Sequence, residues 1–181
     1  MTAHGQMSTT LHSLLLRAKP TPSPSAPMLT TLLLTIRIAM LLTGTQRIED
    51  APLFASACVR ESTAMVSPAR LCAVAFVESG YRYRATNRGG HCGAWQQNPR
   101  WSQMWGDDCA DGCRQPGGAG VTCEELMDVP TAARVASRHL TYLETHPRNR
   151  SPLCRYAGAT GQRCRDYTAA VRRIERGLEG R

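Results

Sequence analysis

Eight cysteines constrain the fold of this chain more than any other feature of its sequence. A high, even number of cysteines within 181 residues is typical of disulfide-bonded proteins from oxidising compartments. We therefore expect an exported protein with a loop region stapled by disulfides. The disulfide candidates are Cys58, Cys72, Cys92, Cys109, Cys113, Cys123, Cys154 and Cys164.

Position along the chain favours two pairings among these cysteines. Cys154 and Cys164 flank a glycine-containing turn, and Cys58 and Cys72 lie on two consecutive predicted helices. The other four cysteines would then pair among themselves. Eight cysteines allow about 105 connectivities, so the sequence alone leaves their pairing open.

Zinc binding is the alternative interpretation of part of the cysteine set. The ligands would be Cys109, Cys113 and Cys123 together with His91 or Cys92. The gaps of three and nine residues between these cysteines do not form the paired Cys-x2-Cys units of common zinc sites. We therefore expect neither a metal nor another cofactor.

Composition favours one mainly α domain with a single core. Aromatic residues make up 6% of the chain, and no stretch alternates apolar and polar residues as a strand would.

The net charge of +8 predicts attraction to polyanions, although a basic surface without a dedicated partner is the simpler interpretation. Arg172, Arg173 and Arg176 would suit nucleic-acid binding, but we expect a solvated helix face there and no nucleic-acid partner, because the cysteines argue against a reducing cytosol.

The first part of the chain differs in composition from the rest. Residues 1–27 form a Ser/Thr/Pro-rich leader that we expect to be flexible. Residues 28–45 form an apolar segment that is shorter than a membrane span and carries Arg37 at its middle. Three interpretations of this segment compete. It is a signal or weak anchor, it is the first helix of the domain at 46–181, or the protein begins at Met28. We favour the helix, whose apolar residues at helical spacing are Leu32, Leu33, Ile36, Met40 and Leu41.

Four further helices are expected, over residues 52–65, 68–79, 130–145 and 167–178. The first of them has Leu53, Phe54, Ala57 and Cys58 as its apolar stripe. The second begins at Pro68 after an N-capping Ser67, and Gly80 ends it. Residues 81–123 between the second and third helices are rich in loops and contain half of the cysteines.

The helix at 68–79 carries a carboxylate on its apolar face. Leu71, Val74, Ala75 and Glu78 are spaced at i, i+3, i+4 and i+7 and therefore share one side. Burial and the negative end of the helix dipole both disfavour the charged form of a carboxyl group, so we expect the pKa of Glu78 to be raised. A carboxyl protonated near neutral pH can donate a proton to a departing sugar oxygen. The plainer alternative is a helix-end residue that reaches solvent.

Four motifs in order around Glu78 resemble the lytic transglycosylase and goose-type lysozyme superfamily. Residues 78–81 (Glu-Ser-Gly-Tyr) match its catalytic phrase, and residues 93–96 (Gly-Ala-Trp-Gln) match its Gly-Leu-Met-Gln-like motif. Residues 128–143 resemble its Asp-Pro lead-in and structural helix. Residues 155–158 (Arg-Tyr-Ala-Gly) resemble its Ala-Tyr-Asn-x-Gly motif.

The resemblance spans about residues 50–177 and implies roles for individual residues. Glu78 would be the catalytic acid and base, and the late tyrosine that lies near this glutamate in the family corresponds to Tyr167. The implied substrate contacts are Ser79, Trp95, Gln96, Tyr156 and Tyr167. His91 and His139 have no nucleophile motif around them, and we interpret both as structural or surface residues.

Two positions depart from the family pattern. Ala157 replaces the asparagine that helps to bind the N-acetyl group of the sugar, which puts substrate orientation in doubt. Trp95 stands where methionine is usual, and it would add a surface on which a sugar ring stacks.

The resemblance implies a lysozyme-like single domain that cleaves peptidoglycan glycan strands. A lytic transglycosylase would cut the MurNAc-GlcNAc β-1,4 bond with one carboxylate and form 1,6-anhydroMurNAc. The alternatives are a hydrolytic lysozyme, in which Asp107 or Asp108 helps water, and an inactive wall-binding module of the same fold. We expect a monomer that is secreted, periplasmic, wall-associated or carried in a phage particle, with transient membrane association through the apolar segment.

Overall fold

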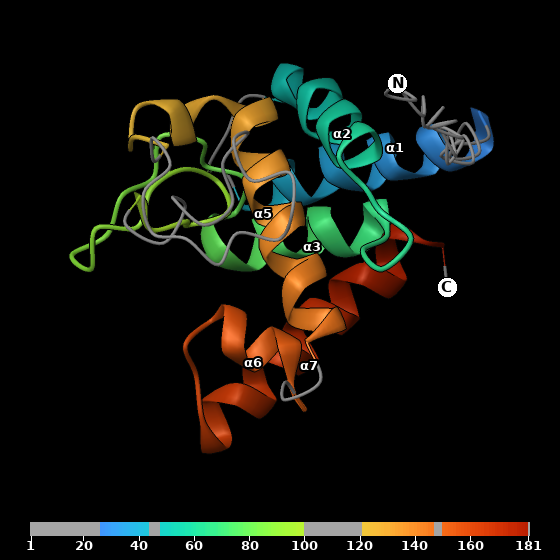
Figure 1. The fold of residues 1–181 in the computed structure, drawn as a ribbon. Helices are drawn as coiled ribbons and strands as arrows, with labels where there is room; N and C mark the ends of the chain where they lie inside the picture. Colours follow the sequence, from blue (N-terminus) through green and yellow to red (C-terminus); the bar gives the residue numbers. More distant parts are fainter. Residues whose placement is uncertain (1–25, 44–47, 100–120, 147–149, 181) are drawn as a thin grey trace, which may run out of the picture.

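Residues 26–43, 48–99, 121–146 and 150–180 are described by a computed structural model, and they fold mainly into helices (Figure 1). Within these ranges no strand forms, and pairing is limited to isolated bridges between Thr86 and Cys92 and between Cys92 and Gln97. The prediction of a mainly α fold is confirmed. The α-helices are α1 (Ala26–Thr43), α2 (Ala51–Arg60), α3 (Pro68–Ser79), α5 (Val129–Thr145), α6 (Pro152–Tyr156) and α7 (Gly161–Leu178), and short 3-10 helices cover Ile48–Asp50 and Glu125–Met127.

Helix α3 begins and ends where the sequence predicts. The Ser67 hydroxyl accepts a hydrogen bond from the Arg70 amide at 3.1 Å, and Pro68 follows as the first helical residue. Gly80 ends the helix with φ 63°, and its amide donates to the Phe76 carbonyl at 2.7 Å. Local signals therefore set both ends of the helix that carries Glu78.

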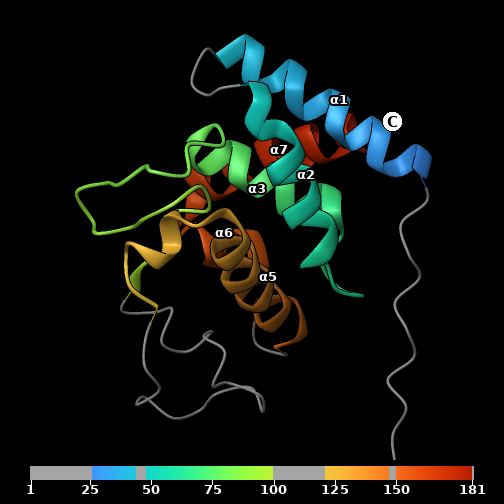
Figure 2. The same ribbon diagram turned by 90° about the horizontal axis from the view of Figure 1, so that it is seen from above.

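Helix α3 lies in the middle of the helical assembly. It packs against α2, α5 and α7, and Figures 1 and 2 show these helices around it from two directions. The residues on its inward face, among them Leu71, Val74 and Ala75, are fully buried. This packing holds the last turn of α3 firmly while leaving its C-terminal end near the surface.

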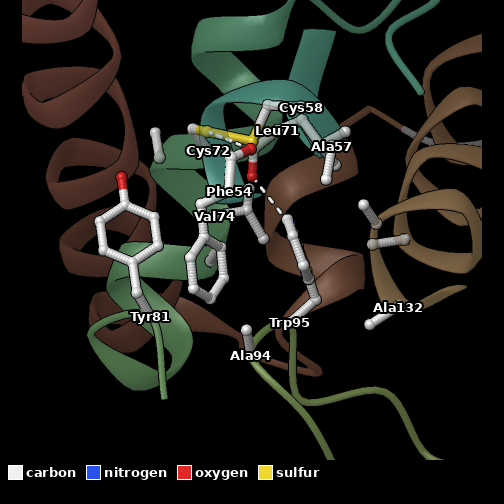
Figure 3. Packing of buried hydrophobic residues seen from close by; sticks show 14 of the residues in the cluster. Phe54, Ala57, Cys58, Leu71, Cys72, Val74, Tyr81, Ala94, Trp95 and Ala132 are labelled. Carbon is white, nitrogen blue, oxygen red and sulfur yellow. Dashed lines mark hydrogen bonds between the residues drawn. A yellow bond between two sulfur atoms is a disulfide. The ribbon is translucent and has the colours of Figure 1, made fainter. Parts of the chain in front are cut away.

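A cluster of aromatic rings fills the core beneath the loop that follows α3 (Figure 3). The Phe54 ring lies with its centroid 5.0 Å from that of Tyr81 and 5.9 Å from that of Trp95. The Trp95 indole Nε1 donates to the Leu71 carbonyl at 2.8 Å. The loop at 81–99 is thus anchored to α2 and α3 by buried rings rather than by secondary structure of its own.

Three disulfides join segments of the described chain. Cys58–Cys72 links α2 to α3, and Cys154–Cys164 links α6 to α7, so both favoured pairings are confirmed. The third disulfide, Cys92–Cys123, pairs two of the four cysteines that remained. Because Cys92 and Cys123 are bonded to each other, neither is a thiolate for zinc.

Other predictions fall on residues that the structure leaves undescribed. Of the leader predicted at 1–27, residues 1–25 lie outside the described ranges, whereas residues 26 and 27 belong to α1 and correct that boundary. Also outside the described ranges are Cys109 and Cys113, the remaining disulfide candidates, and Asp107 and Asp108, the possible helpers of a hydrolytic water.

Helix α1 is packed against the rest of the domain. Leu32, Ile36 and Met40 are buried and belong to the core, whereas Arg37 is exposed. The helix contacts α2 and α7. None of the described helices is both long and apolar enough to span a lipid bilayer.

Two helix boundaries differ from those predicted. Helix α2 ends at Arg60 instead of residue 65, because the Thr63 hydroxyl accepts hydrogen bonds from the amides of Met65 and Val66 and holds a turn there. One residue of the apolar stripe predicted for α2 is also corrected: Leu53 is 44% exposed. Helix α7 begins at Gly161 instead of residue 167.

Helix α6 was missed by the sequence analysis. It consists of five residues, Pro152–Tyr156, which is too short for a hydrophobic period to be recognised. It matters for the site because it carries Tyr156.

Candidate active site

Glu78 opens onto a cleft that has a volume of about 750 Å³. The cleft is bounded by the last turn of α3, by the loop at 87–98, by α5, and by α6 with the residues that follow it. Its lining residues are Glu78, Asn87, His91, Gln96, Gln97, Asn98, His139, Tyr142, Leu143, His146, Arg155, Tyr156, Ala157 and Gly158. Polar side chains converge there on a partly apolar wall, as in a ligand-binding cleft.

The pKa of the Glu78 carboxyl is raised to about 7. Burial is the main cause, because the protein replaces water that would solvate the carboxylate. The Tyr167 hydroxyl opposes this effect by donating to Oε1 of Glu78 at 2.6 Å, which favours the charged form. The predicted direction of the pKa shift is confirmed. At neutral pH both protonation states of Glu78 are populated.

Removing the Tyr167 hydroxyl is expected to raise the pKa of Glu78 further. In Tyr167→Phe the carboxylate loses the hydrogen bond that lowers its pKa, while burial remains. Carbon NMR of the Glu78 side-chain carboxyl, followed as pH rises, checks this prediction. Tyr83→Phe removes a hydroxyl away from the cleft and should leave the titration unchanged. A fall in the Glu78 pKa in Tyr167→Phe would contradict the prediction.

A second polar network lies beside Glu78 and centres on Gln97. This side chain is 4% exposed, and its amide nitrogen donates to the Tyr156 hydroxyl and to the Trp95 carbonyl. The Tyr156 hydroxyl in turn donates to the Trp95 carbonyl at 3.0 Å. The network therefore holds the Tyr156 ring in one position at the cleft wall.

His139 joins the Gln97 network from α5. Its Nδ1 lies 3.3 Å from Oε1 of Gln97, and its ring stacks on Tyr156 with centroids 5.0 Å apart. Since Oε1 of Gln97 is an acceptor, Nδ1 is assigned as the donor. Burial lowers the pKa of His139 to about 4, so the ring is neutral at pH 7.

The sequence interpretation missed the part that Gln97 and His139 play in the cleft. His91, interpreted with His139 as a structural or surface residue, also lines it. The available signals were the position of Gln97 next to Gln96 and the position of His139 on the inner face of α5. Neither signal is specific, because a neighbouring glutamine or a histidine on an inner helix face can also be a hydrogen-bonded structural residue without a role in binding.

Gln96 lies in the cleft wall, but its amide is largely engaged in shaping the loop. Its Nε2 donates to the carbonyls of Ala85 and Gly93, and its Oε1 accepts from Asn87 at 3.0 Å. Its backbone is in the left-handed region, with φ 47°. The structure therefore brings Gln96 to the cleft wall as a residue whose side chain also fixes the loop.

Two of the expected substrate contacts lie in the interior instead. Trp95 is fully buried, and its indole packs in the core, so it presents no face on which a sugar could stack. Ser79 is 5% exposed, and its hydroxyl donates to the Ala94 carbonyl at 2.8 Å. Both expectations are corrected: these residues anchor the loop to α3.

The two tyrosines of the predicted site approach Glu78 from different helices. Tyr156 on α6 lines the cleft, and its pKa is raised by burial and by the nearby Glu78 charge. Tyr167 on α7 does not line the cleft and reaches Glu78 from behind through its hydroxyl. Ala157, at the position where the family pattern has asparagine, also lines the cleft.

Among the described residues that line the cleft, Glu78 is the single carboxylate. In the same part of the chain, no group of three or more histidine, cysteine, aspartate or glutamate side chains is placed to hold a metal ion. The described site therefore consists of one buried carboxyl group, a tyrosine that donates to it, and a wall of amides and rings. Such a carboxyl group can give up a proton and take one back at nearly the same pH.

Comparison of the chain with protein-family models, with curated proteins and with solved structures finds no match in any of the three.

Proposed function

We propose that this protein is a peptidoglycan lytic transglycosylase with a lysozyme-like domain, and that Glu78 is its catalytic acid and base. The observation that carries the proposal is Glu78, the single carboxyl among the described residues of the cleft, with a pKa of about 7. A group with such a pKa is suited to donating and accepting a proton near neutral pH.

The proposed reaction needs one carboxyl group and no water. Protonated Glu78 gives its proton to the oxygen that bridges MurNAc and GlcNAc, and the bond from that oxygen to C1 of MurNAc breaks. The resulting carboxylate removes the proton from the 6-hydroxyl of MurNAc. The 6-oxygen then bonds to C1, which closes the 1,6-anhydro ring and restores protonated Glu78.

The surroundings of Glu78 support both halves of this cycle. Burial favours the protonated form that begins the reaction, and the Tyr167 hydroxyl stabilises the carboxylate formed midway. Tyr156, held by Gln97, and Gln96 would border the sugar rings in the cleft. Because Ala157 offers no amide to the substrate, recognition of an N-acetyl group would fall to other residues of the wall.

The place of action is proposed from the disulfides and the charge. Three disulfides fit an oxidising environment. We propose that the protein is secreted, periplasmic, wall-associated or carried in a phage particle. Its net charge of +8 would draw it to an anionic wall.

The products of purified peptidoglycan test the proposed reaction. Oxidised wild-type protein should release muropeptides that end in 1,6-anhydroMurNAc, detected by mass spectrometry, and these should be absent from a Glu78→Gln digest. Products heavier by one water, with reducing ends, would instead make the protein a hydrolytic lysozyme that uses Glu78. No cleavage by folded wild-type protein would contradict both reactions and favour an inactive wall-binding module.

A further inference from the structure

A second hollow, separate from the cleft, lies against α6. Its volume is about 450 Å³, and none of its lining residues lines the cleft. Helix α6 stands between the two: Leu153 and Cys154 face the second hollow, whereas Arg155 and Tyr156 face the cleft. Whatever this hollow binds is therefore held apart from Glu78.

Arginine dominates the charge of this hollow. Its charged lining residues are four arginines and one glutamate, Glu144. Arg70 donates to Glu144 at 2.8 Å and to Glu175 at 3.1 Å, so its own charge is already balanced by carboxylates. This network of one arginine and two glutamates is not a source of positive charge, which has to come from the other arginines of the hollow.

The other three arginines, Arg150, Arg165 and Arg172, are exposed. None of them forms a salt bridge with a carboxylate of the described residues. Arg165 donates to the side chain of Gln162, which is uncharged and leaves the positive charge uncompensated. Three unbalanced guanidinium groups around one concavity form a site that attracts anions.

The geometry of α7 gathers two of these arginines on one face. Arg165, Thr168, Ala169 and Arg172 are spaced at i, i+3, i+4 and i+7, and all four line the hollow. Arg150 reaches the same hollow from the residues just before α6. Guanidinium groups present several N–H donors in a planar fork that suits the oxygens of phosphate.

We propose that this hollow binds the phosphate groups of a phosphodiester polymer without bases, such as a polyol phosphate chain. Among the described residues no aromatic ring lines it, so nucleic-acid bases would find no surface there on which to stack. The large exposed apolar residues of the described chain, Leu29, Leu34, Leu53 and Met65, belong to α1, α2 and the turn after α2. In the described part of the chain, none of these large exposed apolar side chains thus lines the hollow, where it could enter a lipid surface.

Binding of polyglycerol phosphate to the whole oxidised protein tests the proposal. Calorimetry at two salt concentrations should show affinity that falls with salt. Arg165→Gln combined with Arg172→Gln should weaken binding by about tenfold or more, and the plot of log affinity against log salt should become shallower by about 1.4, or about 0.7 for each lost phosphate contact. Arg150→Gln, on a different segment, should weaken binding in the same direction.

The matched control carries the same loss of charge on the same helix. Arg163→Gln combined with Arg173→Gln removes two exposed arginines of α7 that do not line the hollow. This variant should bind within about threefold of wild type. Equal weakening by both double variants would overturn the proposal, because net charge alone would then explain binding.

Two other phosphate ligands test whether the hollow prefers a phosphodiester chain without bases. Single-stranded DNA carries phosphodiesters on a chain that also bears bases, and vesicles containing phosphatidylglycerol carry phosphodiesters on a lipid surface. Tighter binding of either one than of polyglycerol phosphate, lost in Arg165→Gln with Arg172→Gln, would overturn the proposed ligand. The measurement needs no cleavage activity and can be made in Glu78→Gln, so its outcome is independent of the proposed function.

Discussion

Glu78→Gln should lower the rate of peptidoglycan cleavage by about a thousandfold while leaving the protein folded. Glutamine matches the shape of the carboxyl but can neither donate its proton nor take one back, and such acid–base catalysis contributes about 10² to 10⁴-fold. Because the same group would act twice in the cycle, we expect a loss well above the lower end of that range. The rate of muropeptide release, measured with equal amounts of folded protein, checks this prediction.

A matched control shows whether the loss of activity is specific to Glu78. Glu124→Gln changes an exposed glutamate outside the cleft and should retain wild-type activity. Cleavage by Glu78→Gln at the wild-type rate would exclude Glu78 as the acid and base.

The pKa of Glu78 also predicts how stability changes with pH. Below pH 4.5, the ordinary pKa of a glutamate side chain, the carboxyl is neutral in both the folded and unfolded states, whereas folding opposes its ionisation up to about pH 7. The contribution of Glu78 to stability should therefore fall as pH rises through this window, by about 3 kcal/mol at most. His139, whose pKa is lowered to about 4 by burial, contributes a change of opposite sign in wild type and variant alike, so the comparison between the two isolates Glu78. Glu78→Gln lacks this titration, so it should gain stability relative to wild type between pH 4 and pH 8. Thermal unfolding at the two pH values measures the difference.

Gly93→Ala should destabilise the protein by about 3 kcal/mol, which corresponds to a fall of about 10 °C in melting temperature. A β-carbon at this position would lie 1.9 Å from the backbone oxygen of Leu126, and φ is +76°. Backbone atoms on both sides of this contact leave little room for adjustment. The loop that carries Gln96 and Gln97 would have to move away from the 3-10 helix Glu125–Met127.

Gly90→Ala separates the two causes of this destabilisation. Gly90 has nearly the same φ of +75°, but a β-carbon there would meet nothing within 4 Å. This variant should therefore lose only the cost of a left-handed backbone, about 1 kcal/mol. Equal losses in the two variants, measured by thermal unfolding, would show that close packing at Gly93 is unimportant.

The position of Glu78 could be predicted because local rules govern it. Ser67 and Gly80 fix the ends of α3 through hydrogen bonds to residues within the same helix. The spacing from Leu71 to Glu78 then places the carboxyl on the inward face. Burial followed from that face, and with it the direction of the pKa shift.

The neighbours of Glu78 depend on contacts between residues that are far apart in the chain. Tyr167 is 89 residues away from Glu78, and Tyr156 is 59 residues away from Gln97. Periodicity says which side of a helix is apolar, but it does not say which helix another one meets. The family resemblance pointed to both tyrosines but not to the network around Gln97.

Trp95 and Gln96 are neighbours in the sequence, but one lies in the core and the other at the cleft wall. The amino-acid sequence determined that a loop with a glycine, a tryptophan and two glutamines follows the helix that carries Glu78. Only packing decided which of these side chains faces the cleft. With Gly93 held against Leu126, the chain turns so that the Trp95 ring enters the core beside Phe54 and Gln96 remains at the cleft wall. An irregular loop has no hydrophobic period. Which of its side chains are buried therefore depends on which ones fit the space between α2, α3 and the residues before α5.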